Sequence, residues 1–197
     1  ALTGATLQWI CIGVGYYAVF SWATSLRLRD KPTFALIWGS PAFLVTILGY
    51  GCVAFLSSAT TAFGPTYAAQ VLGESTARIG FWVGGFGALS GFLGVILGGR
   101  MSDWLRTRSE SGRIMVIAFG LVTPVIPVIM GYTTVSDPNS DWDFIRFTIW
   151  VSLANLFASS ALGAAAATTQ DLVMPRMRGT ATATFFLATT LFGLALG

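Results

Sequence analysis

The sequence has no histidine, two cysteines and only eight acidic residues in its 197 positions. Histidine is the most frequent general base and a frequent metal ligand, so its absence removes the usual chemistry of hydrolases and zinc sites. Cys11 and Cys52 lie in apolar stretches without metal-ligand spacing, which is typical of small buried apolar side chains. No nucleophile–base pair is evident, so we expect no enzymatic activity, no metal and no cofactor.

Charged residues are also scarce, at 10% of the chain against about 25% in soluble domains. A membrane-spanning helix needs about 20 mainly apolar residues. Uncharged runs of this kind occupy 5–26, 41–64, 79–99, 114–134, 147–170 and, more briefly, 179–197. We therefore predict an all-α integral membrane protein of a plasma or bacterial inner membrane. The first run has no polar flank on its amino-terminal side, and the last has none on its carboxy-terminal side, which indicates part of a longer chain.

Positive charge alternates between the connections. Nine basic residues lie at 27–31, 100–113 and 171–178, but only Arg78 and Arg146 lie at 65–78 and 135–146. The positive-inside rule places the first set in the cytoplasm. The arginines form short clusters between apolar runs rather than one basic face, so we expect no nucleic-acid partner.

The run 79–99 carries a periodic set of glycines. They are spaced by four, three, four, three and four residues, at Gly80, Gly84, Gly87, Gly91, Gly94 and Gly98. This spacing forms one stripe along a helix, where small residues let a second helix approach closely in lipid. The stripe is open to two interpretations, a static packing surface and a sliding surface. A dinucleotide loop is excluded because no strand precedes Gly85-x-Gly87.

A charged loop follows the stripe, reading Gly99-Arg-Met-Ser-Asp103-Trp-Leu-Arg106-Thr-Arg108. It resembles the G-x-x-x-D-R/K-x-x-R/K loop signature of the major facilitator superfamily, with Trp104 in place of the first basic residue. A carboxylate at a helix end, held by arginines, can lock one transporter conformation. The resemblance implies such a clasp, with a plain topogenic charge cluster as the alternative. Its candidate residues are Gly99, Asp103, Arg106, Arg108 and Arg178.

A second stretch, Pro175-Arg-Met-Arg178-Gly179-Thr-Ala, resembles the P-x-x-R-G/A-T-A turn between helices ten and eleven of that superfamily. Taking the charged loop as the one between helices eight and nine implies a partial superfamily fold. Residues 1–31 then form a membrane helix and its cytoplasmic connection, conceivably helix six. Residues 32–197 form the carboxy-terminal bundle, helices seven to eleven, without the twelfth.

Within the superfamily, the chain is most similar to spinster-like transporters through Phe63-Gly-Pro65-Thr-Tyr67, the glycine-to-Asp103 run and the Pro175 turn. The resemblance implies secondary active, alternating-access transport of a lysophospholipid or sphingolipid. The implied partners are an amino-terminal half that carries any proton coupling, and membrane lipids. A small drug or metabolite is the alternative cargo. The alternative from another class is a non-transporting scaffold that oligomerises through the glycine stripe.

Neutral polar residues inside the predicted spans are candidates for lining a substrate cavity. Helical spacing aligns Ser152, Asn155 and Ser159 on one face, and Tyr50, Ser57 and Thr61 on another, with Phe63 and Tyr67 near the outer mouth. Hydrogen bonding between helices would explain them equally well. Pro65, Pro124 and Pro127 each favour a kink.

Overall fold

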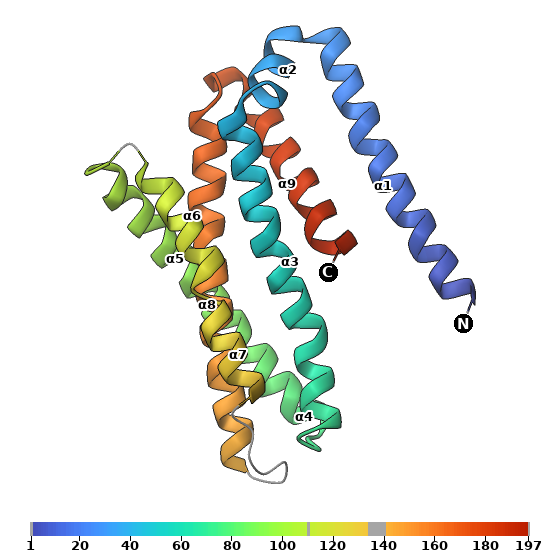
Figure 1. The fold of residues 1–197 in the computed structure, drawn as a ribbon, viewed down its shortest axis with the longest axis vertical. Helices are drawn as coiled ribbons and strands as arrows, with labels where there is room; N and C mark the ends of the chain where they lie inside the picture. Colours follow the sequence, from blue (N-terminus) through green and yellow to red (C-terminus); the bar gives the residue numbers. More distant parts are fainter. Residues whose placement is uncertain (1, 110, 134–140, 197) are drawn as a thin grey trace.

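A computed structural model describes residues 2–109, 111–133 and 141–196, and all regular structure in these ranges is helical (Figure 1). The elements are α1 (Leu2–Arg29), α2 (Lys31–Trp38), α3 (Pro41–Gln70), α4 (Thr76–Ile79), η1 (Gly80–Gly85), α5 (Phe86–Arg106), α6 (Gly112–Val122), α7 (Val125–Thr133), α8 (Asp141–Asp171), η2 (Pro175–Met177) and α9 (Arg178–Leu196).

Four helical stretches in the described part of the chain are long and apolar enough to cross a membrane: Pro41–Gln70, Thr76–Arg106, Gly112–Thr133 and Asp141–Asp171. They match four of the six predicted spans, apart from position 134, which lies outside the described residues, and they confirm the all-α membrane fold. The other two predicted ranges form α1, of 28 residues, and α9, of 19 residues. The predicted lead-in at 33–40 is largely the separate short helix α2.

Helix α8 is the centre of the bundle, because it packs against α3, α5, α6, α7 and α9. Its buried residues include five alanines, of which Ala161, Ala164 and Ala165 are fully buried. Such small side chains let neighbouring backbones come close without apolar burial as the driving force. Helix α1 stands apart from this bundle in Figure 1 and reaches α9 through the Trp22 indole, which donates to the Thr184 hydroxyl over 3.3 Å.

Two spans depart from a regular α-helix. The third span is divided at Pro124 into α6 and α7, as a proline without a backbone donor favours. Pro65 lies inside α3, which continues past it. The second span begins with α4 and then adopts a π-helix over Gly80–Gly85 before α5. Segments of π-helix are rare and occur frequently at functional sites.

Candidate functional site: an intramembrane cavity between charged clusters

A cavity of about 590 Å³ lies among α3, η1, α5, α7 and α8. Small-molecule sites commonly enclose about 300–1,000 Å³, so this volume suits an organic ligand of moderate size. The cavity is lined mainly by apolar side chains, and no charged residue is among those that line it in the described part of the chain. Its polar lining residues are Ser57, Thr60, Thr61, Asn155 and Ser159.

The polar groups of the cavity belong to two walls. On the α8 wall, the Asn155 amide nitrogen donates to the Gly87 carbonyl across 2.7 Å, and the Ser159 hydroxyl lies 3.5 Å from the Asn155 amide oxygen. On the α3 wall, the hydroxyls of Thr60 and Thr61 each donate to a backbone carbonyl one turn earlier, at 2.8 Å. Their oxygens retain lone pairs that can accept hydrogen bonds from a ligand.

Four of the eight predicted cavity residues line this cavity: Ser57, Thr61, Asn155 and Ser159. Tyr50 does not, because its ring packs on Phe185 of α9 with 5.3 Å between centroids. Ser152 lines a separate groove of about 250 Å³ on another face of α8.

The predicted aromatic mouth is also placed differently. Phe63 is 64% exposed on the outside of α3 and does not line the cavity. The Tyr67 ring packs against Tyr132 and Phe147, with centroid distances of 4.9 and 5.3 Å, and its hydroxyl donates to the Tyr132 carbonyl over 3.3 Å. Tyr67 therefore joins α3 to α7 and α8. The spacing of residues identifies a helix face, but it does not identify which neighbour covers that face.

Sequence reasoning missed the apolar lining of the cavity. Ala88 and Phe92 of α5, Pro124 of the turn before α7 and Val128 of α7 contribute to its walls. The glycine stripe could have identified the α5 side of the cavity, since Gly84, Gly87 and Gly91 all line the cavity. Spacing alone gave no signal for the α7 wall.

The glycine stripe divides into three environments. A methyl group added at Gly94 or Gly98 would overlap the backbone carbonyl of Leu156 or Ser160, respectively, so here α5 and α8 touch backbone to backbone. At Gly87 and Gly91 an added Cβ would meet the Asn155 amide nitrogen at 3.9 and 3.4 Å.

Gly80 and Gly84 complete the predicted stripe, and an added Cβ at either would meet nothing within 4 Å. The close approach is therefore concentrated at the inner end of the stripe, and its middle faces the cavity.

An ion-pair cluster closes the predicted cytoplasmic end of the bundle. Arg113 of α6 is the central group: its side chain is only 12% exposed and pairs with Asp171 of α8 and, at 3.6 Å, with Asp103 of α5. Its guanidinium also donates to the Ala167 carbonyl over 3.1 Å. Arg106 lies 2.8 Å from the same Asp171 carboxylate. The cluster joins the ends of three helices through Asp103, Arg106, Arg113 and Asp171.

The remaining predicted clasp residues lie around this cluster. The Arg108 guanidinium stacks 4.1 Å above the Trp104 ring, and Arg178 is exposed at the start of α9 without an ion pair among the described residues. A Cβ added to Gly163 of α8 would lie 3.3 Å from the Gly99 Cα atom, so Gly99 is a packing position. The prediction missed Arg113, whose burial follows from tertiary packing and not from the loop pattern.

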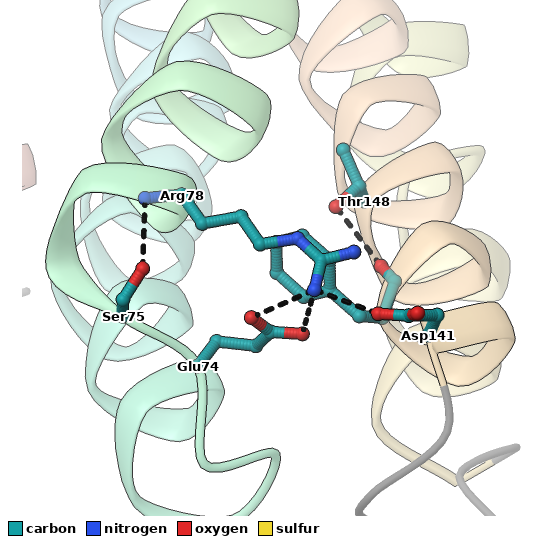
Figure 2. A network of polar contacts seen from close by, with 6 residues as sticks. Glu74, Ser75, Arg78, Asp141 and Thr148 are labelled. Carbon is teal, nitrogen blue, oxygen red and sulfur yellow. Dashed lines mark hydrogen bonds and ion pairs between the residues drawn. The ribbon is translucent and has the colours of Figure 1, made fainter.

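A second charged network lies at the opposite end of the bundle (Figure 2). The Arg78 guanidinium of α4 contacts the Glu74 carboxylate at 3.0 Å and the Asp141 carboxylate at 2.7 Å. It also lies 5.0 Å from the centre of the Phe144 ring. Ser75 caps α4 by accepting from the Arg78 backbone N–H. The network connects the start of the second span to the start of α8.

Comparison with known proteins identifies transporters. The chain is 25% identical over 153 residues to an MFS-type efflux pump of Mycolicibacterium smegmatis, covering 78% of this chain and 34% of that protein. It is 29% identical over 146 residues to the probable galactarate/D-glucarate transporter GudP of Escherichia coli, covering 69% of this chain and 30% of that protein. The chain thus spans about a third of the length of each relative.

No protein family and no solved structure matches the chain. The two relatives give no support to the narrower resemblance to spinster-like lipid transporters. The relatives are transporters rather than enzymes, and they agree with the four apolar spans. The similarities and the fold together indicate an integral membrane protein that is similar to membrane transporters.

Proposed function

We propose that the chain forms the carboxy-terminal half of a secondary active transporter that moves an amphipathic, lipid-like molecule by alternating access. Residues 32–197 form one half of the transport unit, and residues 1–31 connect it to an amino-terminal half. That second half supplies the facing wall of the substrate path and any proton coupling. The observation that carries the proposal is the intramembrane cavity, with its apolar lining and neutral polar groups.

The chemistry of the cavity favours an amphipathic cargo over a strongly charged one. A buried dicarboxylate such as D-glucarate needs cationic partners, and the described cavity lining contains none, whereas a zwitterionic lysolipid headgroup carries its own countercharge. The apolar walls gain roughly 25 cal/mol for each Å² of apolar ligand surface removed from water. The Asn155 amide and the threonine oxygens can bind hydroxyl, ester or amide groups at the polar end of the same molecule.

The ion-pair cluster supports a conformational role for the predicted cytoplasmic end. Asp103, Arg106, Arg113 and Asp171 hold the ends of α5, α6 and α8 in one arrangement. Each ion pair has at least one partly exposed member, so these contacts can break and re-form at low energetic cost when helices move. We propose that the cluster stabilises one state of the transport cycle.

Transport by the full-length protein in proteoliposomes tests this role. Uptake of a radiolabelled lysophosphatidylcholine is measured for the unmodified protein and for the Asp103→Asn, Arg106→Ala double variant. We expect a clear loss of rate with substrate binding retained. Unchanged transport by the double variant would remove the clasp from the mechanism. Arg108→Ala is the matched control, because Arg108 stacks on Trp104 outside the cluster.

A small drug or metabolite is the second candidate cargo, favoured by the functions of the two relatives, efflux and galactarate/D-glucarate transport. Competition separates the two candidates. Lysophosphatidylcholine should compete with a bound fluorescent amphiphile in purified full-length protein, whereas D-glucarate should not. Competition by D-glucarate alone would replace the amphiphile with a sugar acid as the cargo.

A further inference from the structure

The glycine stripe and the π-helical segment η1 imply different registers for the outer end of the second span. On a regular α-helix, with about 100° per residue, all six glycines from Gly80 to Gly98 would fall within roughly 40° of one line. In the structure, the Gly80–Gly85 segment is π-helical, and Gly80 and Gly84 meet nothing that an added Cβ would touch. The sequence pattern therefore suits an α-helical form of this segment that differs from the form observed.

The inner end of α5 cannot rotate to accommodate this difference. Gly94 and Gly98 lie against the α8 backbone so closely that an added Cβ would overlap the carbonyl groups of Leu156 and Ser160. A change between π-helix and α-helix shifts the hydrogen-bond register by one residue, which turns one side of the segment by about 100° relative to the other. Because α8 holds the inner side, the outer side would turn.

A long-range hydrogen bond inside the predicted membrane region lies next to the junction of η1 and α5. The Gly87 carbonyl, two residues beyond η1, accepts from the Asn155 amide at 2.7 Å and from the Ser90 hydroxyl at 2.9 Å. Asn155 is the one amide side chain among the described cavity-lining residues. The same nitrogen therefore belongs both to the cavity wall and to the bond beside this junction.

We propose that Asn155 couples cavity occupancy to the register of α5. A ligand that carries a hydrogen-bond acceptor, such as the ester or hydroxyl oxygen of an amphiphile, takes the Asn155 amide from the Gly87 carbonyl. The released segment 80–85 then converts to α-helix, which aligns Gly80 and Gly84 with the rest of the stripe. This coupling rests on the proposed transport function and assigns Asn155 as a positioning residue for the outer end of the span.

The rotation would reach the outer charged network. Arg78 precedes η1 by two residues and binds both Glu74 and Asp141, so turning the segment would separate Arg78 from Asp141 (Figure 2). Trp82 would also leave its position stacked on Phe86, where the ring centroids are 5.2 Å apart. A hydrogen bond between a ligand and Asn155 in the cavity would thus break the Arg78–Asp141 ion pair at the outer surface.

Hydrogen exchange of backbone amides tests the coupling in the purified full-length protein. Asn155→Leu keeps the side-chain size and removes the donor, and we expect the exchange rates of amides in 80–90 to change by about tenfold, the effect of losing one bond of this kind. Ser57→Ala is the matched control, since it removes a cavity hydroxyl from the opposite wall, and it should change these rates less than twofold. Asn155→Ser, too short to reach Gly87, serves as a second variant if Asn155→Leu misfolds.

The same exchange measurement is repeated with saturating lysophosphatidylcholine. We expect the ligand to change exchange in 80–90 of the unmodified protein and to have no further effect in Asn155→Leu. Unchanged exchange rates in both Asn155 variants would overturn the inference, whatever the effect of the ligand. Ligand that binds but leaves the exchange rates of 80–90 unchanged would overturn it as well. If lysophosphatidylcholine does not bind, the amphiphile is wrong as the cargo, and ligand binding does not drive the coupling. The two Asn155 variants would still show whether Asn155 controls the helical register of 80–85.

Discussion

Replacing Gly98 with alanine should separate α5 from α8. The added Cβ would lie 2.5 Å from the Ser160 Cα atom and still closer to the Ser160 carbonyl oxygen. Carbon atoms pack favourably at about 3.5–4.0 Å, so the two helices must move apart by about 1 Å or more. The obstructing atoms are backbone, so no side-chain rotation can relieve the overlap.

The expected cost follows from two opposing terms. Overpacking a close contact costs about 1–3 kcal/mol, and the higher end applies where backbone must move. Alanine gains about 1 kcal/mol over glycine in a helix interior, which offsets part of that cost. Gly80→Ala is the matched control, because its Cβ meets nothing within 4 Å and only the favourable helix term remains. The two variants should therefore differ by about 1–3 kcal/mol.

Thermal unfolding of the full-length protein in one detergent, followed by tryptophan fluorescence, measures this difference. The shift is about 2–4 °C for each kcal/mol in chains of 150–250 residues and smaller in a longer protein, so Gly98→Ala should unfold measurably below Gly80→Ala. Equal Tm values for the two variants would show that α5 and α8 are not in backbone contact at Gly98. Such a result would refute the packing assigned to the inner end of the stripe.

Three further changes test other contacts. Arg113→Ala should cost about 2 kcal/mol of unfolding free energy, because it removes the charged hydrogen bonds to Asp171, whereas Arg108→Ala should cost little. Asp141→Asn should lower Tm slightly at low ionic strength, and the difference should vanish in about 1 M salt, since the Asp141 side chain is 80% exposed. Tyr67→Phe should cost about 1 kcal/mol by removing one hydrogen bond while the ring packing remains.

Each of the three has a result that would contradict it. Equal losses in the two arginine variants would remove Arg113 from the centre of the inner cluster. A salt-independent effect of Asp141→Asn would indicate a packing role in place of the ion pair with Arg78. An unchanged Tm in Tyr67→Phe would show that the Tyr132 carbonyl finds another donor.

The sequence was sufficient to predict the four spanning segments at Pro41–Gln70, Thr76–Arg106, Gly112–Thr133 and Asp141–Asp171, because the length and charge of apolar runs follow from bilayer thickness and from the cost of buried charge. The break at Pro124 was equally accessible, since it depends on a missing backbone donor. The π-helical form of η1 could not be predicted, because the continuous glycine spacing favours an unbroken α-helix and the sequence does not reveal the long-range bond from Asn155 to Gly87 beside it.

The cavity residues were predictable only in part, because contacts between distant helices decide which helix faces meet. Ser57, Thr61, Asn155 and Ser159 were identified from helix faces, and these faces meet at the cavity. Tyr50 and Tyr67 occupy similar faces but pack against Phe185 and Tyr132, which only the assembled bundle brings close. Arg113 belongs to the inner cluster because α6 turns back onto α8, a contact that loop charge alone does not specify.

Thiol accessibility during transport tests most directly whether this cavity lies on the substrate path. Ala88 lines the cavity, and the adjacent Leu89 is exposed and does not line it. The test uses full-length protein in which every native cysteine, Cys11 and Cys52 included, is replaced by serine. A bulky methanethiosulfonate should inhibit lysophosphatidylcholine transport by the Ala88→Cys variant, and bound substrate should protect the variant from inhibition. Leu89→Cys should keep its activity. Equal inhibition of both variants, or inhibition of Ala88→Cys without substrate protection, would contradict the cavity as the substrate path.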